Sequence, residues 1–313
     1  MTTNQDLIII GAGGAGLSAA QYGARGNLRT LLLEEVSSGG QALLIDTLEN
    51  YPGFPEPVSG FDFTLKMEEQ AKKFGAKVEN GSVSSIRKED GHFVVETDHG
   101  LLTSLAVILA TGAKHRTLGV PGEAELAGKG VSYCATCDGP FFKGKRVFVV
   151  GGGDAACDEA MYLAHLAESV LMIHRKDKFR AQKALASRVL ANPKITVHFN
   201  TELRRIEGDT LVRKVGLVNT SSGKECEEEV SAVFVFIGSD PSTNLVAGMK
   251  LPLDEGGYIE TNQRMETRVP GLYAVGDVRA SPFRQLVVAA GEGAVAAHAA
   301  GQYIDEIRGQ KYS

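Results

Sequence analysis

Residues 7–16 read Leu-Ile-Ile-Ile-Gly-Ala-Gly-Gly-Ala-Gly, and this stretch decides the fold. Its four apolar residues predict a short buried strand. The glycines that follow, with a helical pattern over residues 17–26, match the G-x-G-x-x-G turn of dinucleotide-binding units. Such glycines permit a tight turn and let backbone N–H groups approach a pyrophosphate closely. A second predicted strand at residues 30–33 ends at Glu34, where a carboxylate can accept hydrogen bonds from an adenosine ribose.

The same unit recurs in the middle of the chain. Residues 146–150 predict a strand, residues 151–156 read Gly-Gly-Gly-Asp-Ala-Ala, and a helix and a strand at 170–173 follow. The spacing from the first glycine to the end of the second strand is the same in both copies. This match indicates a duplication. We therefore predict an α/β protein with two Rossmann-like units.

Each copy continues in a similar way. Turns at residues 98–100 and 221–223 lie between alternating apolar and polar residues, a pattern that predicts antiparallel hairpins. Hydrophobic strands predicted at 107–112 and 233–238 then close the two units, and each ends on a glycine. The expected domains are of the three-layer (ββα) kind.

The informative difference between the copies lies at the end of the second strand. Where the first copy has Glu34, the second has His174-Arg175-Lys176, with Arg180 further on. Cationic side chains in place of the acid suit the 2′-phosphate of NADPH. Read singly, Arg175 and Arg180 are also compatible with ordinary solvated surface charges.

A Cys-x-x-Cys pair lies between the two units. Cys134 and Cys137 can face the same way in a helical turn, close a small disulfide loop, and reopen it without refolding. Asp138 follows directly and can carry protons to and from a sulfur, or can simply cap a turn. Half of a zinc site is the rival interpretation of the pair, but Cys157 and Cys226 form no second pair of this kind. We predict no metal.

Composition limits the function further. A chain of 313 residues suits two domains, and a formal charge of −5 without a basic block argues against a nucleic-acid partner. No apolar run reaches the roughly 18 residues of a membrane-spanning helix. The N-terminal residues 1–6 carry no basic region of a signal peptide. We therefore expect a cytoplasmic protein with no membrane partner.

The assembled motifs resemble those of the low-molecular-weight, bacterial-type thioredoxin reductases, which belong to the class II pyridine nucleotide-disulfide oxidoreductases. The resemblance covers essentially the whole chain. It is carried by the stretches at residues 11–16, 39–41, 49–53, 110–112, 134–139, 151–156 and 174–181, by Gly276-Asp277-Val278, and by Arg284-Gln285. The sequence Cys-Ala-Thr-Cys-Asp-Gly between two dinucleotide units is the most specific of these.

The resemblance implies that the second domain, residues 114–243, is inserted into a discontinuous FAD-binding domain of residues 1–113 and 244–313. It implies FAD contacts at Gly11, Gly13, Gly14, Ala15, Gly16, Glu34, Glu35, Gly40, Gln41, Asn50, Ala110, Thr111, Gly112, Gly276, Asp277, Arg284, Gln285 and Leu286. It implies NADPH contacts at Gly151, Gly153, Asp154, Ala155, His174, Arg175, Lys176, Arg180, Ile237 and Gly238.

The resemblance also implies an activity. NADPH would reduce FAD, FAD would reduce the Cys134/Cys137 disulfide, and Cys134 would attack the disulfide of thioredoxin. Cys137 would lie against the flavin, and Asp138 would serve as acid and base. A homodimer is implied too, and the stretches 112–116 and 239–244 are expected to act as a paired hinge.

Three departures from the family pattern bear on these expectations. Lys176 replaces a commonly found arginine, which weakens the preference for NADPH over NADH. Asp154 and Ala155 replace a commoner asparagine and a hydroxyl residue, and Leu286 stands where an alanine is frequent. The alternative functions are a flavoenzyme of this type that acts on another dithiol protein, or a small-molecule dithiol oxidase.

Overall fold

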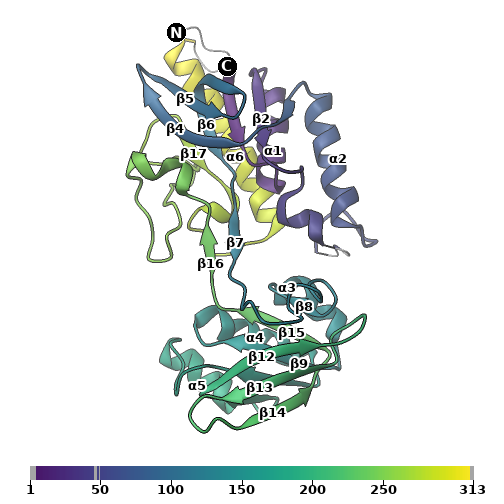
Figure 1. Cartoon of the computed structure of the whole chain (residues 1–313). Helices are drawn as coiled ribbons and strands as arrows, with labels where there is room; N and C mark the ends of the chain where they lie inside the picture. The colour runs from purple at the N-terminus through teal and green to yellow at the C-terminus, as the bar shows by residue number, and fades with distance from the viewer. Residues whose placement is uncertain (1–4, 46–47, 49, 311–313) are drawn as a thin grey trace. The chain divides into compact units, whose positions relative to one another are not determined.

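The computed structural model describes residues 5–45, 48 and 50–310. It divides the chain into two compact units (Figure 1). The first unit comprises Met1–Lys114 and Asp240–Ser313, and the second unit comprises His115–Ser239. The second unit thus interrupts the first in sequence, and the predicted α/β class with one Rossmann-like domain inserted into another is confirmed. Residues 1–4 of the N-terminal stretch and Glu49 of the motif at 49–53 lie outside the described residues.

The first unit is built on a sheet of strand order β3-β2-β1-β6-β5-β4, in which β17 also pairs with β6. The strands are β1 (Gln5–Ile10), β2 (Thr30–Glu34), β3 (Lys77–Asn80), β4 (Val83–Glu89), β5 (His92–Thr97), β6 (Gly100–Leu109) and β17 (Leu272–Ala274). Strand β1 pairs in parallel with β2 and β6, β2 pairs in parallel with β3, and β17 pairs in parallel with β6. Strands β4, β5 and β6 form an antiparallel meander. The predicted hairpin around residues 98–100 is confirmed.

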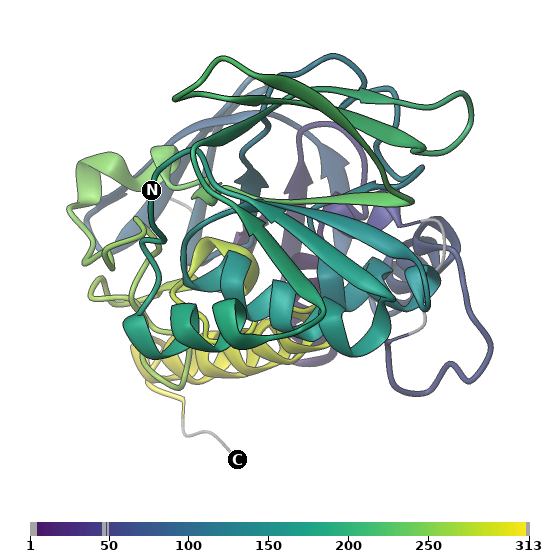
Figure 2. The same ribbon diagram turned by 90° about the horizontal axis from the view of Figure 1, so that it is seen from below.

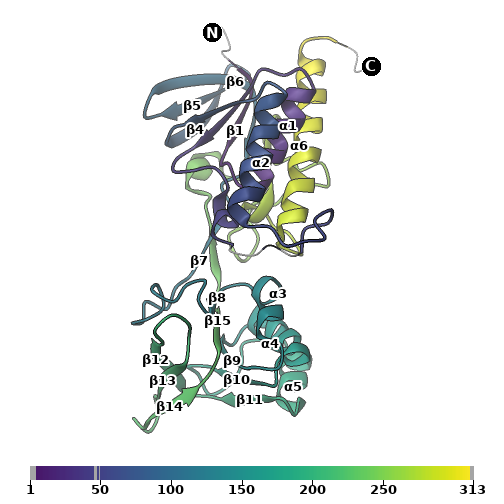
Figure 3. The ribbon, with the colours of Figure 1, turned by 90° about the vertical axis from the view of Figure 1, so that its right-hand side faces the viewer.

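Helices cover one face of this sheet, and the β4–β5 hairpin lies on the other side of β1 (Figure 3). The helices are α1 (Gly14–Arg25), α2 (Gly60–Lys73) and α6 (Leu286–Ile307), with short 3-10 turns η1 (Gly40–Leu44), η3 (Asn244–Met249) and η4 (Gly276–Val278). This gives the three layers expected of the unit.

The central strand β1 is buried on both faces. Leu7 and Ile9 join the core formed with α1 and α6, while Ile8 and Ile10 join the core formed with β4 and β5. Successive side chains of a strand point to opposite faces, so a strand between two layers needs an unbroken apolar run. The glycine turn at its carboxyl end is therefore held by two cores.

The second unit repeats this plan. Its parallel sheet has the order β11-β10-β9-β15-β8, and a separate antiparallel sheet has the order β12-β13-β14. The strands are β8 (Val131–Ser132), β9 (Arg146–Gly151), β10 (Ser169–Ile173), β11 (Ile195–His198), β12 (Thr201–Glu207), β13 (Lys214–Asn219), β14 (Glu225–Glu229) and β15 (Ala232–Phe236). The helices are α3 (Ala135–Asp138), α4 (Asp154–Leu166) and α5 (Lys183–Ala191), with the 3-10 turn η2 (Gly139–Phe142).

Figure 2 shows α4 and α5, the parallel sheet and the antiparallel sheet of this unit as three layers. Val147 and Val149 of β9 pack with α4, whereas Phe148 and Val150 pack with β12 and β13. The central strands of the two units therefore divide their side chains between two cores in the same manner.

Two predicted strands are longer in the sequence pattern than in the structure. The strands predicted at 107–112 and 233–238 end earlier, because the chain turns out of the sheet before each closing glycine. Gly112 has a φ of +67° and Gly238 a φ of +108°, in the region that favours glycine.

The two stretches by which the chain passes between the units are paired with each other. Strands β7 (Ala113–His115) and β16 (Ser239–Pro241) form a two-stranded sheet. The backbone N–H of Arg116 donates to Gly238 O over 3.0 Å, and that of Ser242 donates to Gly112 O over 3.0 Å. The rotation predicted for this pair of connections stays a prediction.

Candidate active site

Cys134 and Cys137 form a disulfide, with their Cα atoms 5.3 Å apart. Both are half-buried, while Cys157 is free and buried and Cys226 is free and exposed. Within the described part of the chain, no group of three or more His, Cys, Asp or Glu side chains could hold a metal ion. The expectation that the pair closes a small loop is confirmed.

The short helix α3 starts directly after Cys134. The backbone N–H of Cys137 donates to Cys134 Sγ over 3.2 Å, and the N–H of Asp138 donates to Cys134 O over 3.1 Å. N–H groups directed at a sulfur favour its thiolate form. Opening the disulfide would therefore leave Cys134 in surroundings that promote nucleophilic attack.

The segment that carries the disulfide, α3 and η2, packs against α4. A Cβ atom added at Gly139 would lie 3.0 Å from Leu163 Cδ2, so the glycine lets η2 approach the helix closely. The same helix begins at the second glycine turn. The redox pair and that turn are thus parts of one packed unit.

Asp138 is half-buried at the end of α3. Burial raises the pKa of its carboxyl group above the ordinary value, and a hydrogen bond with Ser132 partly opposes this change. A carboxyl group with a raised pKa keeps its proton to a higher pH. That property suits a group that donates a proton to a departing thiolate.

The two phenylalanines after the pair have different surroundings. Phe142 packs edge-on against Phe234 of β15, with ring centroids 5.9 Å apart, and belongs to the core of the second unit. Phe141 is 45% exposed. Phe142 is therefore a core residue, whereas Phe141 lies at the surface.

The first glycine turn has the geometry of a nucleotide cradle. A Cβ atom at Gly11 would lie 2.4 Å from Ala110 O, and one at Gly16 would lie 1.8 Å from Gly11 O, so neither position admits a side chain. Gly13 differs, because no atom lies within 4 Å of its Cβ position. No side chain caps α1 at this residue. An uncapped helix start with open space before it fits a pyrophosphate group.

Glu34 lies beside this turn. Its Oε2 accepts the N–H of Ala12 over 2.7 Å, and its Oε1 accepts the N–H of Val36 over 3.2 Å. Each carboxylate oxygen retains a further lone pair with which it can accept a ribose hydroxyl. Its neighbour Glu35 is exposed and accepts the hydroxyl of Ser82 over 3.3 Å.

Segments distant in sequence converge on the same turn. Asn50 Nδ2 donates to Gln285 Oε1 over 3.1 Å, and Leu286 Cδ1 lies 2.3 Å from the Cβ position of Gly14. Gln41 Nε2 donates to the backbone oxygen of Ala113 over 2.5 Å. The structure therefore brings the predicted residues of the 41, 50 and 285 loops onto one unit.

Four further predicted FAD residues lie in the same unit. Arg284 is exposed, with its guanidinium carbon 3.9 Å from the centre of the Tyr258 ring. The hydroxyl of Thr111 donates to Ser242 O over 2.8 Å, so it helps to fix the chain after β6. Gly276 begins η4 with a φ of +67°, and Asp277 follows it in the same turn.

Glu292, which was not among the predicted residues, supports the turn that carries Gly276 and Asp277. It is 8% exposed on α6, and its Oε2 accepts the N–H of Gly276 over 2.7 Å. Its other oxygen forms a salt bridge with Arg279. The turn that carries Asp277 is therefore held by a buried ion pair. An acid within the alanine-rich start of α6 was the signal available in the sequence.

The second glycine turn resembles the first, and a returning segment, residues 174–182 after β10, also contacts it. Gly153, like Gly13, has no atom within 4 Å of its Cβ position, and no side chain caps α4 there. The N–H of Arg180 donates to Gly152 O over 2.7 Å, and the N–H of Gln182 donates to Asp154 Oδ1 over 2.7 Å. These bonds anchor the segment after β10 to the glycine turn.

The predicted cations of this segment are exposed, and His174 is not. Arg175, Lys176 and Arg180 all lie at the surface, with Asp154 and Ala155 exposed at the start of α4. Cationic side chains on a segment fastened to an uncapped helix start fit a phosphorylated ribose. Ile237 is half-buried and Gly238 exposed in the loop that follows β15.

His174 is only 6% exposed, and its ring covers Gly152, whose Cβ position lies 2.3 Å from His174 Nδ1. Burial lowers the pKa of this imidazole, and the charges of Arg180, Arg175 and Lys176 lower it further. Its Nε2 has no hydrogen-bond partner. The ring therefore packs over the turn as a neutral imidazole and adds no positive charge.

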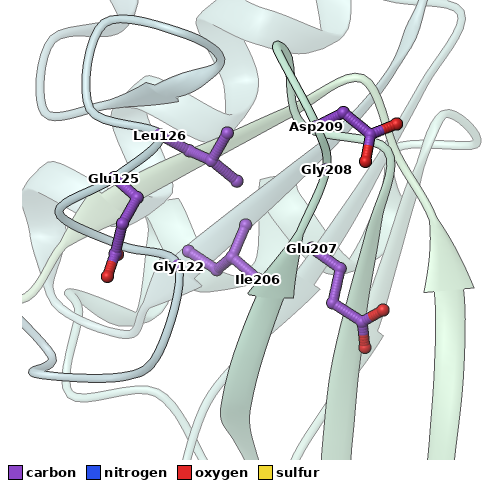
Figure 4. A pocket seen from close by; sticks show the side chains of 7 residues that line it. All are labelled: Gly122, Glu125, Leu126, Ile206, Glu207, Gly208 and Asp209. Carbon is purple, nitrogen blue, oxygen red and sulfur yellow. The ribbon is translucent and has the colours of Figure 1, made fainter.

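A hollow of about 430 Å³ in the second unit is lined by Gly122, Glu125, Leu126, Ile206, Glu207, Gly208 and Asp209 (Figure 4). None of these residues is among the predicted site residues. Three carboxylates at its wall oppose an anionic nucleotide. We therefore do not assign a nucleotide to this hollow.

The chain belongs to the pyridine nucleotide-disulphide oxidoreductase family, whose model matches residues 5–294. It is 53% identical over 308 residues to a thioredoxin reductase of Treponema pallidum (strain Nichols), covering 98% of this chain and 100% of the relative. It is 44% identical over 304 residues to a thioredoxin reductase of Bacillus subtilis (strain 168), covering 97% and 96%. The resemblance inferred from the motifs is confirmed.

The fold gives the same result. The crystal structure of thioredoxin reductase from Streptococcus pyogenes MGAS5005 superposes with a TM-score of 0.92 at 39% identity, covering 96% of this chain and 98% of that one. Among the helices that the structure describes, none is long and apolar enough to cross a membrane.

Proposed function

We propose that this chain is a thioredoxin reductase, in which electrons pass from NADPH through FAD to the Cys134–Cys137 disulfide and on to the disulfide of a thioredoxin. The observation that carries this proposal is the disulfide itself. It lies in the unit that also holds a glycine turn with a cationic returning segment. Curated relatives matched over nearly their whole length are named thioredoxin reductase.

The FAD would be held by residues 1–113 and 244–313. We assign its contacts to the glycine turn (Gly11, Gly13, Gly14, Ala15 and Gly16), to Glu34 and Glu35, to Gly40, Gln41 and Asn50, to Ala110, Thr111 and Gly112, and to Gly276, Asp277, Arg284, Gln285 and Leu286. The open cradle at Gly13 and the carboxylate beside it support this assignment. Bound there, FAD supplies the chemistry that accepts a hydride and delivers two electrons to a disulfide.

NADPH would be held by residues 114–243. We assign its contacts to Gly151, Gly153, Asp154, Ala155, His174, Arg175, Lys176, Arg180, Ile237 and Gly238. The open cradle at Gly153 and the exposed cations support the assignment, since a 2′-phosphate needs charged donors and NADH carries no such group.

The cysteines would then exchange the electrons with thioredoxin. The Cys134 thiolate attacks one sulfur of the thioredoxin disulfide, and a mixed disulfide forms as the other thioredoxin sulfur leaves as a thiolate. Asp138 donates a proton to that leaving sulfur. The Cys137 thiolate attacks Cys134 Sγ and restores the internal disulfide, and the second thioredoxin sulfur leaves as a thiolate. This thiolate takes a proton from solvent, so thioredoxin is released as a dithiol. We place Cys137 on the flavin side of the pair, as in the family.

We further propose a cytoplasmic homodimer. The family resemblance implies the homodimer. A cytoplasmic setting is compatible with a redox-active pair, because structural disulfides are rare there.

The test is a steady-state assay with the FAD-loaded protein, run under anaerobic conditions and repeated in air. We expect NADPH to be oxidised in proportion to the oxidised thioredoxin added, and much more slowly without it. A dithiol oxidase would instead consume NADPH in air without thioredoxin and form peroxide. NADPH oxidation that depends on oxygen and is indifferent to thioredoxin would contradict the proposal.

A further inference from the structure

Ser132, the residue two positions before the disulfide, is buried and in contact with the redox element. It is 4% exposed at the end of β8. Its hydroxyl accepts the N–H of Cys134 over 3.1 Å and donates to Cys134 O over 3.2 Å. Cys134 O also accepts the N–H of Asp138 over 3.1 Å. The backbone N–H and the backbone oxygen of Cys134 are therefore both hydrogen-bonded to Ser132.

The conformation of Cys134 determines which hydrogen bonds its sulfur can accept. Cys134 has an extended backbone and caps α3, with its Sγ accepting the N–H of Cys137. A thiolate at this position keeps the N–H bond only while the capping conformation persists. A hydrogen bond to a charged group is worth more than one to a neutral group, so it lowers the thiol pKa.

We propose that Ser132 is a positioning residue of the disulfide centre, because its buried hydroxyl fixes Cys134 in the conformation that directs the Cys137 N–H at the Cys134 sulfur. The inference deepens the proposed function, on which its role in turnover rests.

The ionisable groups near the disulfide lie on α3, just before the pair, and on α4. Helix α3 carries Asp138, Tyr133 precedes the pair, and η2 carries none. The helix α4, which packs against α3, carries Asp154, Cys157, Asp158, Glu159, Tyr162 and His165. Serine is not ionisable, so replacing Ser132 by alanine changes none of these groups. A shift in the titration of Cys134 on changing Ser132 therefore reports on the hydroxyl.

The test measures alkylation of Cys134 by iodoacetamide as a function of pH. The FAD-loaded full chain is used in a Cys137→Ser background, which keeps the backbone N–H at 137 but removes the second thiol. Modification at Cys134 is counted by peptide mass. We expect Ser132→Ala to move the midpoint to higher pH and to slow alkylation at pH 7 by about threefold to tenfold. Ser132→Thr, which keeps a hydroxyl group, should restore most of the rate.

Tyr133→Phe is the matched control. It also removes one hydroxyl hydrogen bond next to the pair, from Tyr133 to Glu123 Oε1 at 2.9 Å, without touching either cysteine. We expect its alkylation profile to match that of the parent. A Ser132→Ala profile that superimposes on the parent, or a Tyr133→Phe shift of equal size, would overturn the proposal.

The alkylation assay uses neither NADPH nor thioredoxin, so its outcome is separate from that of the proposed function. A chain that fails to reduce thioredoxin but shows the Ser132 shift refutes the function and leaves the positioning role intact. A chain that reduces thioredoxin but lacks the shift does the reverse.

Discussion

Cys134→Ser and Cys137→Ser are each expected to lower the rate of thioredoxin reduction by at least about a thousandfold, because neither variant can close the internal disulfide and both lose part of the exchange chemistry. Both should still bind FAD, whose assigned contacts lie in the other unit. The measurement is the NADPH-dependent reduction of oxidised thioredoxin, alongside NADPH oxidation with an artificial one-electron acceptor. The second activity should survive in both variants.

Cys226→Ser is the control for this prediction. It makes the same chemical change at a free, exposed cysteine on β14, which has no proposed role. Its thioredoxin reduction should equal that of the parent chain. Substantial thioredoxin reduction by Cys134→Ser or Cys137→Ser would show that the electrons leave the protein by another route.

Arg175→Ala and Arg180→Ala are expected to raise the KM for NADPH by about tenfold to a hundredfold, the loss of one charged hydrogen bond of roughly 1.5 to 3 kcal/mol. The KM for NADH should change little, because NADH lacks the 2′-phosphate. Lys176→Arg should sharpen the preference for NADPH, since a guanidinium offers a planar pair of donors. The measurement is the KM for both nucleotides in each variant.

Lys178→Ala is the matched control, because it removes a positive charge from an exposed side chain of the same segment. It should change the KM for NADPH only through the general field, by less than either arginine variant. Equal effects of an arginine variant on NADPH and NADH would remove the assignment of the segment to the 2′-phosphate.

The sequence predicted the parts of the fold that depend on local pattern. The glycine turns after β1 and β9 were found because each combines a buried strand, a glycine run and a helix within one short stretch. The Cys134–Cys137 pair was also predicted from local pattern, because two cysteines separated by three positions in a helical turn can form a disulfide. The binding roles of the individual site residues stay predictions.

The features that the sequence did not reveal depend on tertiary packing. His174 reads as one of a run of cations, and its burial follows from a strand end that faces Gly152, where no side chain intervenes. Glu292 meets Gly276 only once α6 has packed beside η4. Ser132 has no distinguishing feature in the sequence, and only the structure shows that its hydroxyl accepts the N–H of Cys134. None of these contacts has a periodicity or a motif of its own.

The central claim is that the Cys134–Cys137 disulfide carries the electrons, and the most direct measurement follows these two residues during turnover. The protein is mixed anaerobically with NADPH and then with oxidised thioredoxin, quenched with a thiol-alkylating reagent, and mapped by peptide mass. The account predicts that NADPH converts the pair to two alkylated thiols and that thioredoxin returns it to the disulfide at least as fast as steady-state turnover, while Cys157 and Cys226 do not change. Reduction of thioredoxin while Cys134 and Cys137 stay joined would contradict it.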